Sequence, residues 1–122
     1  MYELTVETQF SSAHNLRGYE GACENLHVHN WRVEVSVSAQ RPDAVGMVMD
    51  FKKLKAAAMK VTDGLDHKYL NETMPFDKEN PTAENIARHI WKSLSASLND
   101  GNVRVSRVRV WESDTSMAEY HE

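Results

Sequence analysis

The chain of 122 residues lacks the features that mark secreted, membrane and nucleic-acid-binding proteins. Its single cysteine, Cys23, excludes an internal disulfide, and no apolar run approaches the roughly 20 residues of a membrane-spanning helix. The N-terminus lacks a signal peptide's charged-then-apolar pattern. Positive charge is also scarce, since a formal net charge of −4 gives no broad basic surface for nucleic acid. We therefore expect a cytoplasmic, reduced protein that binds neither membranes nor nucleic acid, although local clusters can hold a small anion.

Three segments have the pattern of strands. Apolar and polar residues alternate over residues 2–10 and again over residues 31–38, which predicts two half-buried strands. Residues 103–111 are rich in β-branched side chains, which favours a third. In this last segment the valines change parity between Val105 and Val108, so we expect a bulge there or burial on both faces.

Two segments have the pattern of helices. The first is predicted to begin at an Asp50 N-cap and to end at Gly64, and the second to begin at a Thr82 N-cap and to end at residues 99–101. Apolar residues at three- and four-residue steps define the faces that we expect to be buried. In the first helix these are Phe51, Leu54, Ala57, Ala58 and Val61, and in the second Ile86, Ile90, Trp91, Leu94 and Leu98.

The order of these elements predicts an α+β fold, with one domain over residues 1–122. Hydrophobic residues make up 41% of the chain, which is enough for a core, and no repeat or linker divides it. A further short strand fits between the helices or near the C-terminus. Long valine-rich strands are poor candidates for exposed sheet edges, so we expect an oligomer that joins sheets edge to edge into a barrel.

A group of metal-binding residue types surrounds the start of the second strand. His27 and His29 alternate with Val28, so both imidazoles project to one face at the beginning of a strand. His14 follows the first strand, and a glycine-containing loop can bring its ring back toward the pair. Three neutral imidazoles with a nearby thiol, that of Cys23, indicate an open catalytic zinc site rather than a closed structural one.

Taken one at a time, the polar residues of interest also fit ordinary structural roles. A histidine pair on a strand is often a surface pair, and a lone cysteine such as Cys23 is most often a small buried hydrophobe. Asp66 can close a turn, and Glu112 can be the solvated end of the third strand. We read His89 as a helix-face residue and His121 as part of a loose terminus.

Six segments, taken in order, resemble a known family. They are Phe10-Ser11-Ser12-Ala13-His14, Cys23-x-x-x-His27-x-His29-Asn30, Met49-Asp50-Phe51, Leu65-Asp66-His67-x-x-Leu70-Asn71, Asn80-Pro81-Thr82-Ala83-Glu84-Asn85 and a late strand ending in Glu112. Over nearly the whole chain they resemble the 6-pyruvoyltetrahydropterin synthase/6-carboxytetrahydropterin synthase family. The short Cys-x-x-x-His spacing and the compact length are more similar to the bacterial 6-carboxytetrahydropterin synthases of the queuosine pathway than to the animal pyruvoyl enzymes.

The resemblance implies a tunnelling fold and a set of active-site roles. The fold would be a four-stranded antiparallel sheet with two helices on one face, and the sheets of a trimer or a hexamer would form a barrel with active sites between subunits. Zn²⁺ would be bound by His14, His27 and His29. Protons would be moved by Cys23, Asp66 and His67, and Glu112 would anchor the pterin. Zinc held by neutral imidazoles keeps its charge and an open position, with which it can stabilise an enolate.

The implied substrate is 7,8-dihydroneopterin triphosphate, and the leading product is 6-carboxy-5,6,7,8-tetrahydropterin, formed with release of triphosphate and acetaldehyde. A pyruvoyl product stays open, as does a hydroxymethyl one, because Glu20 and Glu24 lie near Cys23. A non-catalytic zinc- and pterin-binding barrel is the alternative of another class, and it would need neither Cys23 nor His67. Val28 replaces the family's glycine. Its side chain is expected to point away from the imidazoles, so the metal site should be retained while the pocket floor changes shape.

Overall fold

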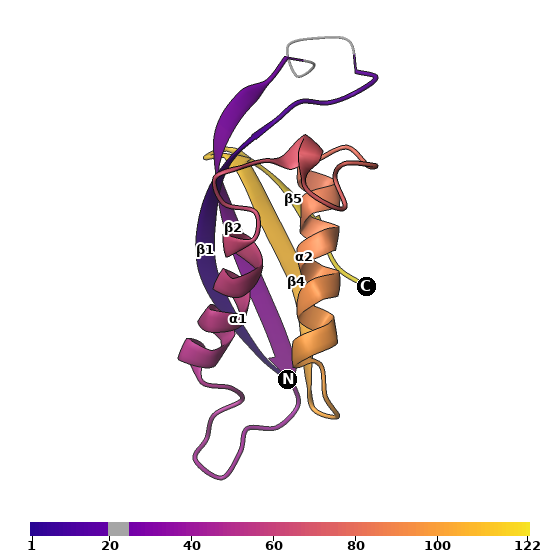
Figure 1. Ribbon diagram of the computed structural model, residues 1–122. Helices are drawn as coiled ribbons and strands as arrows, with labels where there is room; N and C mark the ends of the chain where they lie inside the picture. Colours follow the sequence, from indigo (N-terminus) through magenta and orange to yellow (C-terminus); the bar gives the residue numbers. More distant parts are fainter. Residues whose placement is uncertain (20–24) are drawn as a thin grey trace.

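The computed structural model describes residues 1–19 and 25–122, which form one twisted sheet with two helices against it (Figure 1). The elements are β1 (Tyr2–His14), β2 (His27–Ala39), α1 (Phe51–Asp63), β3 (Lys68–Tyr69), the 3-10 turn η2 (Leu70–Glu72), α2 (Ala83–Leu98), β4 (Val103–Ser113) and β5 (Ser116–Tyr120). The strand order is β3-β1-β2-β4-β5. Both helices lie on the same face of the sheet, which confirms the α+β class (Figure 1).

The expected strand number of four and the expectation of a purely antiparallel sheet are both wrong in detail. The sheet has five strands, and β3 pairs with β1 in parallel through two residues, Lys68 and Tyr69. The two additional strands, β3 and β5, lie between the helices and near the C-terminus, where the sequence allowed for a short strand. The shortness of β3 explains why no alternation of residue types marks it.

Both N-terminal strands extend further than their apolar patterns. β1 continues to His14 and β2 begins at His27, and these two histidines face each other in the register of the antiparallel pair. Ser12 pairs with His29 and Phe10 with Trp31 in the same register. His14 is therefore part of the strand rather than of the loop after it. All three histidines lie in the hydrogen-bonded pair of β1 and β2.

The predicted irregularity in the last long strand is a β-bulge. In the β2–β4 pair, Val37 faces Val105 while the preceding Ser36 faces Arg107, which leaves Ser106 as the extra residue. The bulge resets the alternation, so that Val105 and Val108 are both buried on the helix-covered face.

The helices begin where the sequence predicts. The Asp50 carboxylate accepts the backbone N–H of Lys52 at 2.8 Å, and the Thr82 hydroxyl accepts the N–H of Asn85 at 3.1 Å, so both N-caps are confirmed. Four expected core positions differ. Phe51, at the first turn of α1, is 59% exposed, and Ala57, Val61 and Trp91 are half-buried.

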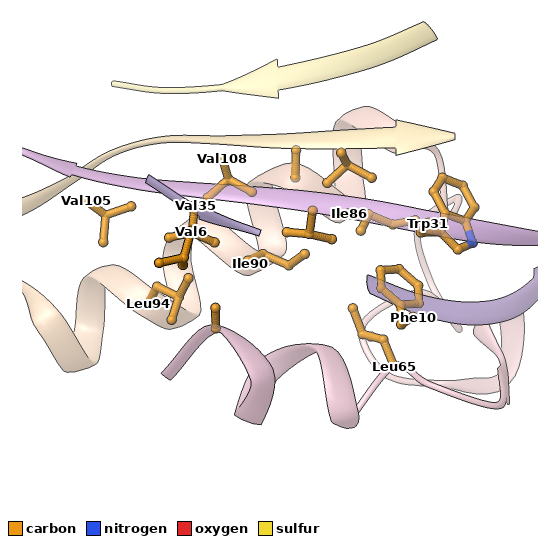
Figure 2. Packing of buried hydrophobic residues seen from close by; sticks show 14 of the residues in the cluster. Val6, Phe10, Trp31, Val35, Leu65, Ile86, Ile90, Leu94, Val105 and Val108 are labelled. Atoms are coloured by element: carbon orange, nitrogen blue, oxygen red, sulfur yellow. The ribbon is translucent and has the colours of Figure 1, made fainter. Parts of the chain in front are cut away.

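The core fills the space between the helices and the sheet (Figure 2). Valines from β1, β2 and β4 meet Ile86, Ile90 and Leu94 of α2, while Phe10 and Trp31 stack at one end with ring centroids 5.8 Å apart. Among the described residues, no helix is long and apolar enough to span a membrane.

Candidate metal centre

Four side chains from three strands converge at the end of the core beside Trp31. Alternation places His14 of β1 and both His27 and His29 of β2 on the helix-covered face, and Glu112 of β4 joins them. One potential ligand atom from each of the four lies within 4.8 Å of every other. The imidazole rings contact one another edge to face, with centroids 4.4 to 5.2 Å apart. Sequence spacing thus predicted correctly that His27 and His29 share a face, whereas His14 joins them through the register of β1 rather than through a loop.

Two backbone carbonyls fix the orientation of the rings. Nδ1 of His14 lies 2.8 Å from the Pro81 carbonyl oxygen, and Nδ1 of His27 lies 2.7 Å from that of Asn25. Since a carbonyl only accepts, each Nδ1 carries the hydrogen, and the lone pair of each ring is on Nε2. Ring orientation by a second hydrogen bond is typical of metal-binding histidines.

The Nε2 atoms of His14 and His29 are buried and make no hydrogen bond within the part of the chain that the structure describes. A buried polar atom without a partner is costly, and a cation at the centre of the cluster would satisfy both atoms. The residues present therefore fit a divalent metal ion held by imidazoles, with a carboxylate beside it.

Burial favours the neutral form of two of these imidazoles, those of His14 and His29. His14 is only 2% exposed, and this burial lowers its pKa below the usual value, although the Pro81 hydrogen bond acts in the opposite direction. Burial likewise lowers the pKa of His29, against the opposing effect of the nearby Glu112 carboxylate. Because protons compete with metal ions for the same lone pair, a lowered pKa leaves both ligands free at neutral pH.

Trp31 forms the wall of the site. Its ring makes T-shaped contacts with His14 at 4.9 Å and with His29 at 5.4 Å between centroids, and it also stacks on Phe10. The metal centre is therefore continuous with the hydrophobic core, which holds the imidazoles in place and excludes water from one side.

The position of Glu112 within the cluster was missed by sequence reasoning, which placed it only at the pterin. Its Oε1 lies 3.0 Å from Nε2 of His29 and 3.4 Å from Nε2 of His14. The bulge explains this, because Val108 and Val110 are buried on the helix-covered face and Glu112 continues their alternation. Counting the parity from Val108 along β4 would have found it.

Asp66 and His67 form a hydrogen-bonded pair at the edge of β1. Nδ1 of His67 lies 2.8 Å from Oδ2 of Asp66, whose Oδ1 accepts the backbone N–H of Ser11 at 2.8 Å. These two hydrogen bonds, that of Ser11 first, lower the pKa of Asp66 below its usual value. His67 has a left-handed backbone with φ of 54°, and its ring is 82% exposed. An oriented, accessible imidazole of this kind can donate or accept a proton.

The Asp66–His67 pair and the histidine cluster do not meet within one chain. The pair opens on a surface pocket of about 390 Å³ that Ser11 and Asn30 also line. Ser11 faces Asn30 in the register step next to Ser12 and His29, so its side chain points to the opposite face of the sheet. In the described residues no hydrogen bond or ion pair joins His67 to the cluster.

Cys23, with Glu20 and Glu24, lies outside the described residues, so the role of the thiol stays a prediction. Val28 is 69% exposed and alternates with His27 and His29, which confirms that its side chain points away from the imidazoles.

The fold and the site define an α+β protein in which three histidines and a carboxylate at one end of a sheet could hold a metal ion. The chain belongs to the 6-pyruvoyl tetrahydropterin synthase family, whose sequence model matches residues 3–122.

Individual relatives agree with this assignment. The chain is 33% identical to a 6-carboxy-5,6,7,8-tetrahydropterin synthase from Haemophilus influenzae, with both chains fully covered. It is 38% identical to the protein of that name from Synechocystis, over 98% of this chain and 93% of the relative. Its fold is similar to that of the Caenorhabditis elegans 6-pyruvoyl tetrahydropterin synthase, with a TM-score of 0.85 and 26% identity over 100% of this chain and 97% of the other.

Proposed function

We propose that this chain is a zinc-dependent lyase that converts 7,8-dihydroneopterin triphosphate to 6-carboxy-5,6,7,8-tetrahydropterin, releasing triphosphate and acetaldehyde. The observation that carries the proposal is the convergence of His14, His27 and His29, with buried Nε2 atoms on two of them that make no hydrogen bond in the described chain and approach only the Glu112 carboxylate. The names of the relatives at 33% and 38% identity favour the carboxy product over the pyruvoyl one.

The three imidazoles would hold Zn²⁺, and Glu112 lies within reach of the same centre. Bound zinc supplies Lewis acidity, which favours loss of a proton from a carbon next to a coordinated hydroxyl. The remaining chemistry falls to side chains of the chain itself, which bind the substrate, orient it and move protons.

Proton transfer is assigned to Cys23 and to the pair of Asp66 and His67. A carboxylate whose pKa is lowered stays ionised at neutral pH, so Asp66 accepts the Nδ1 hydrogen of His67 and orients the ring. His67 then acts as the general acid. The Cys23 thiol, whose usual pKa is about 8.5, would act as the base in its thiolate form.

Glu112 is proposed to anchor the pterin. A carboxylate accepts two parallel hydrogen bonds, which matches the amino group and the adjacent ring N–H of a pterin. The contact between Glu112 and His29 places this acceptor directly beside the metal centre, so an anchored pterin would have its side chain close to the imidazoles.

We further propose a homo-oligomeric barrel of three or six copies in which the site is shared. Within one chain the His67 pair opens on the face opposite the histidine cluster, so a second copy is needed to bring the two together. β3 pairs only with Ser12 and Ala13, and Ser11 bonds Asp66 and His67, so among the described residues the edge of β1 at residues 2–10 stays open to a partner strand.

The test is to incubate the zinc-loaded protein with 7,8-dihydroneopterin triphosphate and to identify the products by mass spectrometry. The proposal expects 6-carboxytetrahydropterin, a precursor for queuosine, with one acetaldehyde for each product molecule. A pyruvoyl or hydroxymethyl product would overturn the product assignment and keep the chemistry class. Binding of zinc and pterin without any product would identify a non-catalytic barrel.

A further inference from the structure

Two asparagine side chains extend the ladder of β1 beyond its last paired residue. Asn71 accepts the backbone N–H of Asn15 at 3.0 Å and donates its own N–H to the Asn15 carbonyl at 2.8 Å. Asn80 does the same with Arg17, accepting its N–H at 3.0 Å and donating to its carbonyl at 2.8 Å. Each carboxamide thereby makes the two hydrogen bonds that a partner residue in a strand would make.

We call each such pair of hydrogen bonds from one asparagine a clasp. Both clasps are close to His14. Asn71 holds the residue that directly follows His14, and Asn80 precedes Pro81, whose carbonyl accepts the hydrogen of His14 Nδ1. The Asn80 carbonyl is in turn held by the side chain of Asn85 at 2.8 Å. The backbone after His14 and the acceptor of its ring are thus fixed by one connected set of hydrogen bonds.

The guanidinium of Arg17 adds further hydrogen bonds to the segment before Pro81. It donates to the carbonyls of Phe76 at 2.7 Å and Glu79 at 2.8 Å, so the segment that presents Pro81 is held at several points. This segment joins η2 to α2 beside the end of the sheet that carries the histidines (Figure 1). A ring held this firmly enters metal coordination without losing further conformational freedom.

We propose that Asn71 and Asn80 are positioning residues for His14: their clasps hold its ring in the Nδ1–H tautomer, with Nε2 directed into the metal centre. This inference rests on the proposed metal site. Loss of a partner that orients a metal ligand typically weakens metal affinity by about 10- to 100-fold. We therefore expect Asn80→Ala and Asn71→Ala to weaken Zn²⁺ binding by roughly this amount.

The chain offers a matched control at the opposite end of the sheet. Asn102 makes the same clasp on Arg41, accepting its N–H at 3.3 Å and donating to its carbonyl at 2.7 Å. It lies in the connection between α2 and β4, near the N-terminus and far from the histidines (Figure 1). Asn102→Ala removes the same number of hydrogen bonds and should lower the melting temperature comparably while leaving Zn²⁺ affinity unchanged.

Two measurements on the full-length protein test the inference. Zn²⁺ affinity is measured by competition with a chromophoric chelator, and equal affinities for Asn80→Ala and Asn102→Ala would overturn it. The tautomer of His14 is read by ring-nitrogen NMR of the zinc-free protein at a pH where histidines are neutral. The wild type and Asn102→Ala should show only the Nδ1–H form, and Asn80→Ala a mixture of both tautomers; an unmixed Nδ1–H form in Asn80→Ala would overturn the inference.

Failure of the proposed metal site and failure of the positioning role give different results. If the wild type binds no Zn²⁺ but the tautomer of His14 responds as expected, the metal site of the proposed function fails and the positioning role stands. If Asn80→Ala does not fold, Asn80→Asp replaces it, since aspartate keeps the shape and the acceptor but cannot donate to the Arg17 carbonyl. An Asp variant with wild-type affinity and tautomer would count against the inference in the same way.

Discussion

Oε1 of Glu112 lies 3.0 Å from Nε2 of His29, which joins the end of β4 to the start of β2. This contact places a carboxylate oxygen within 4.8 Å of a potential ligand atom on each of the three imidazoles. The substrate anchor and the metal centre proposed for this chain are therefore neighbours, and a change at one should be measured for its effect on both.

Glu112→Gln is expected to weaken pterin binding more than metal binding. Glutamine keeps the shape of the side chain but offers one acceptor oxygen and no charge, and a hydrogen bond to a charged group contributes about 1.5–3 kcal/mol. We expect the KM for the pterin triphosphate to rise by about 10-fold or more on this basis, with one zinc per chain retained. Steady-state kinetics and metal analysis check this, and loss of zinc with unchanged KM would instead make Glu112 a ligand.

The histidines divide into two groups with opposite behaviour toward zinc. His29→Asn should lose both zinc and turnover, because the shorter amide cannot place a lone pair at the position of Nε2. His67→Asn should lose turnover but keep zinc, since His67 makes no contact with the cluster in the described part of the chain. Zinc content per chain and product formation separate the two, and His121→Asn serves as a neutral control.

A mixture of the two inactive variants tests whether copies of the chain share one site. If His67 of one copy acts at the zinc of another, unfolding and refolding His29→Asn and His67→Asn chains together should restore activity, to ~25% of wild type for random mixing in a closed ring. The variants refolded separately are the control. A mixture that stays inactive although mixed oligomers form would place the whole site in one chain.

His89, which the sequence assigned to a helix face, gives a prediction for the pH dependence of folding. It is half-buried with its ring edge-on to Phe76 at 5.5 Å, and burial lowers its pKa against the opposing charge of Glu79. The neutral ring is therefore favoured in the folded state. Its contribution to stability is fully present above the unfolded pKa of about 6.5 and decreases as the pH falls through that value toward the folded pKa.

Urea unfolding of the zinc-free protein at pH 7.5 and pH 5.5 measures this effect. We expect the wild type to lose more stability between the two pH values than His89→Gln, which cannot be protonated. Other histidines titrate in both proteins, so the difference between the two losses isolates His89. Identical losses would show that His89 titrates alike in the folded and unfolded chain.

Much of this architecture follows from local sequence. Asp50 and Thr82 cap helices where their side chains can accept backbone hydrogens, and the parity change between Val105 and Val108 marks a true bulge. The His27 and His29 pair was predictable because alternation in a strand is strictly periodic. Strand ends were less predictable, since the ladder of β1 continues to His14 through polar residues that carry no apolar pattern.

What the sequence could not show depends on contacts between distant segments. Glu112 reaches His29 from a strand whose register shifts twice, at Ser106 against β2 and at Glu112 against β5. The clasps of Asn71 and Asn80 join residues more than 50 positions apart, and an asparagine in a loop gives no local sign of such a partner. The separation of His67 from the cluster could likewise not be predicted. It depends on the pairing of β1 with β2, which places Ser11 on the face of the sheet opposite the histidines.

The central claim is that the histidine cluster is a metal centre for pterin chemistry. It is tested most directly by measuring acetaldehyde release from 7,8-dihydroneopterin triphosphate with metal-depleted protein, with the same protein after addition of Zn²⁺, and with His29→Asn treated alike. The account predicts no release before zinc, release with zinc for the wild type, and none for His29→Asn. Equal release before and after addition of zinc, or zinc-dependent release by His29→Asn, would contradict it.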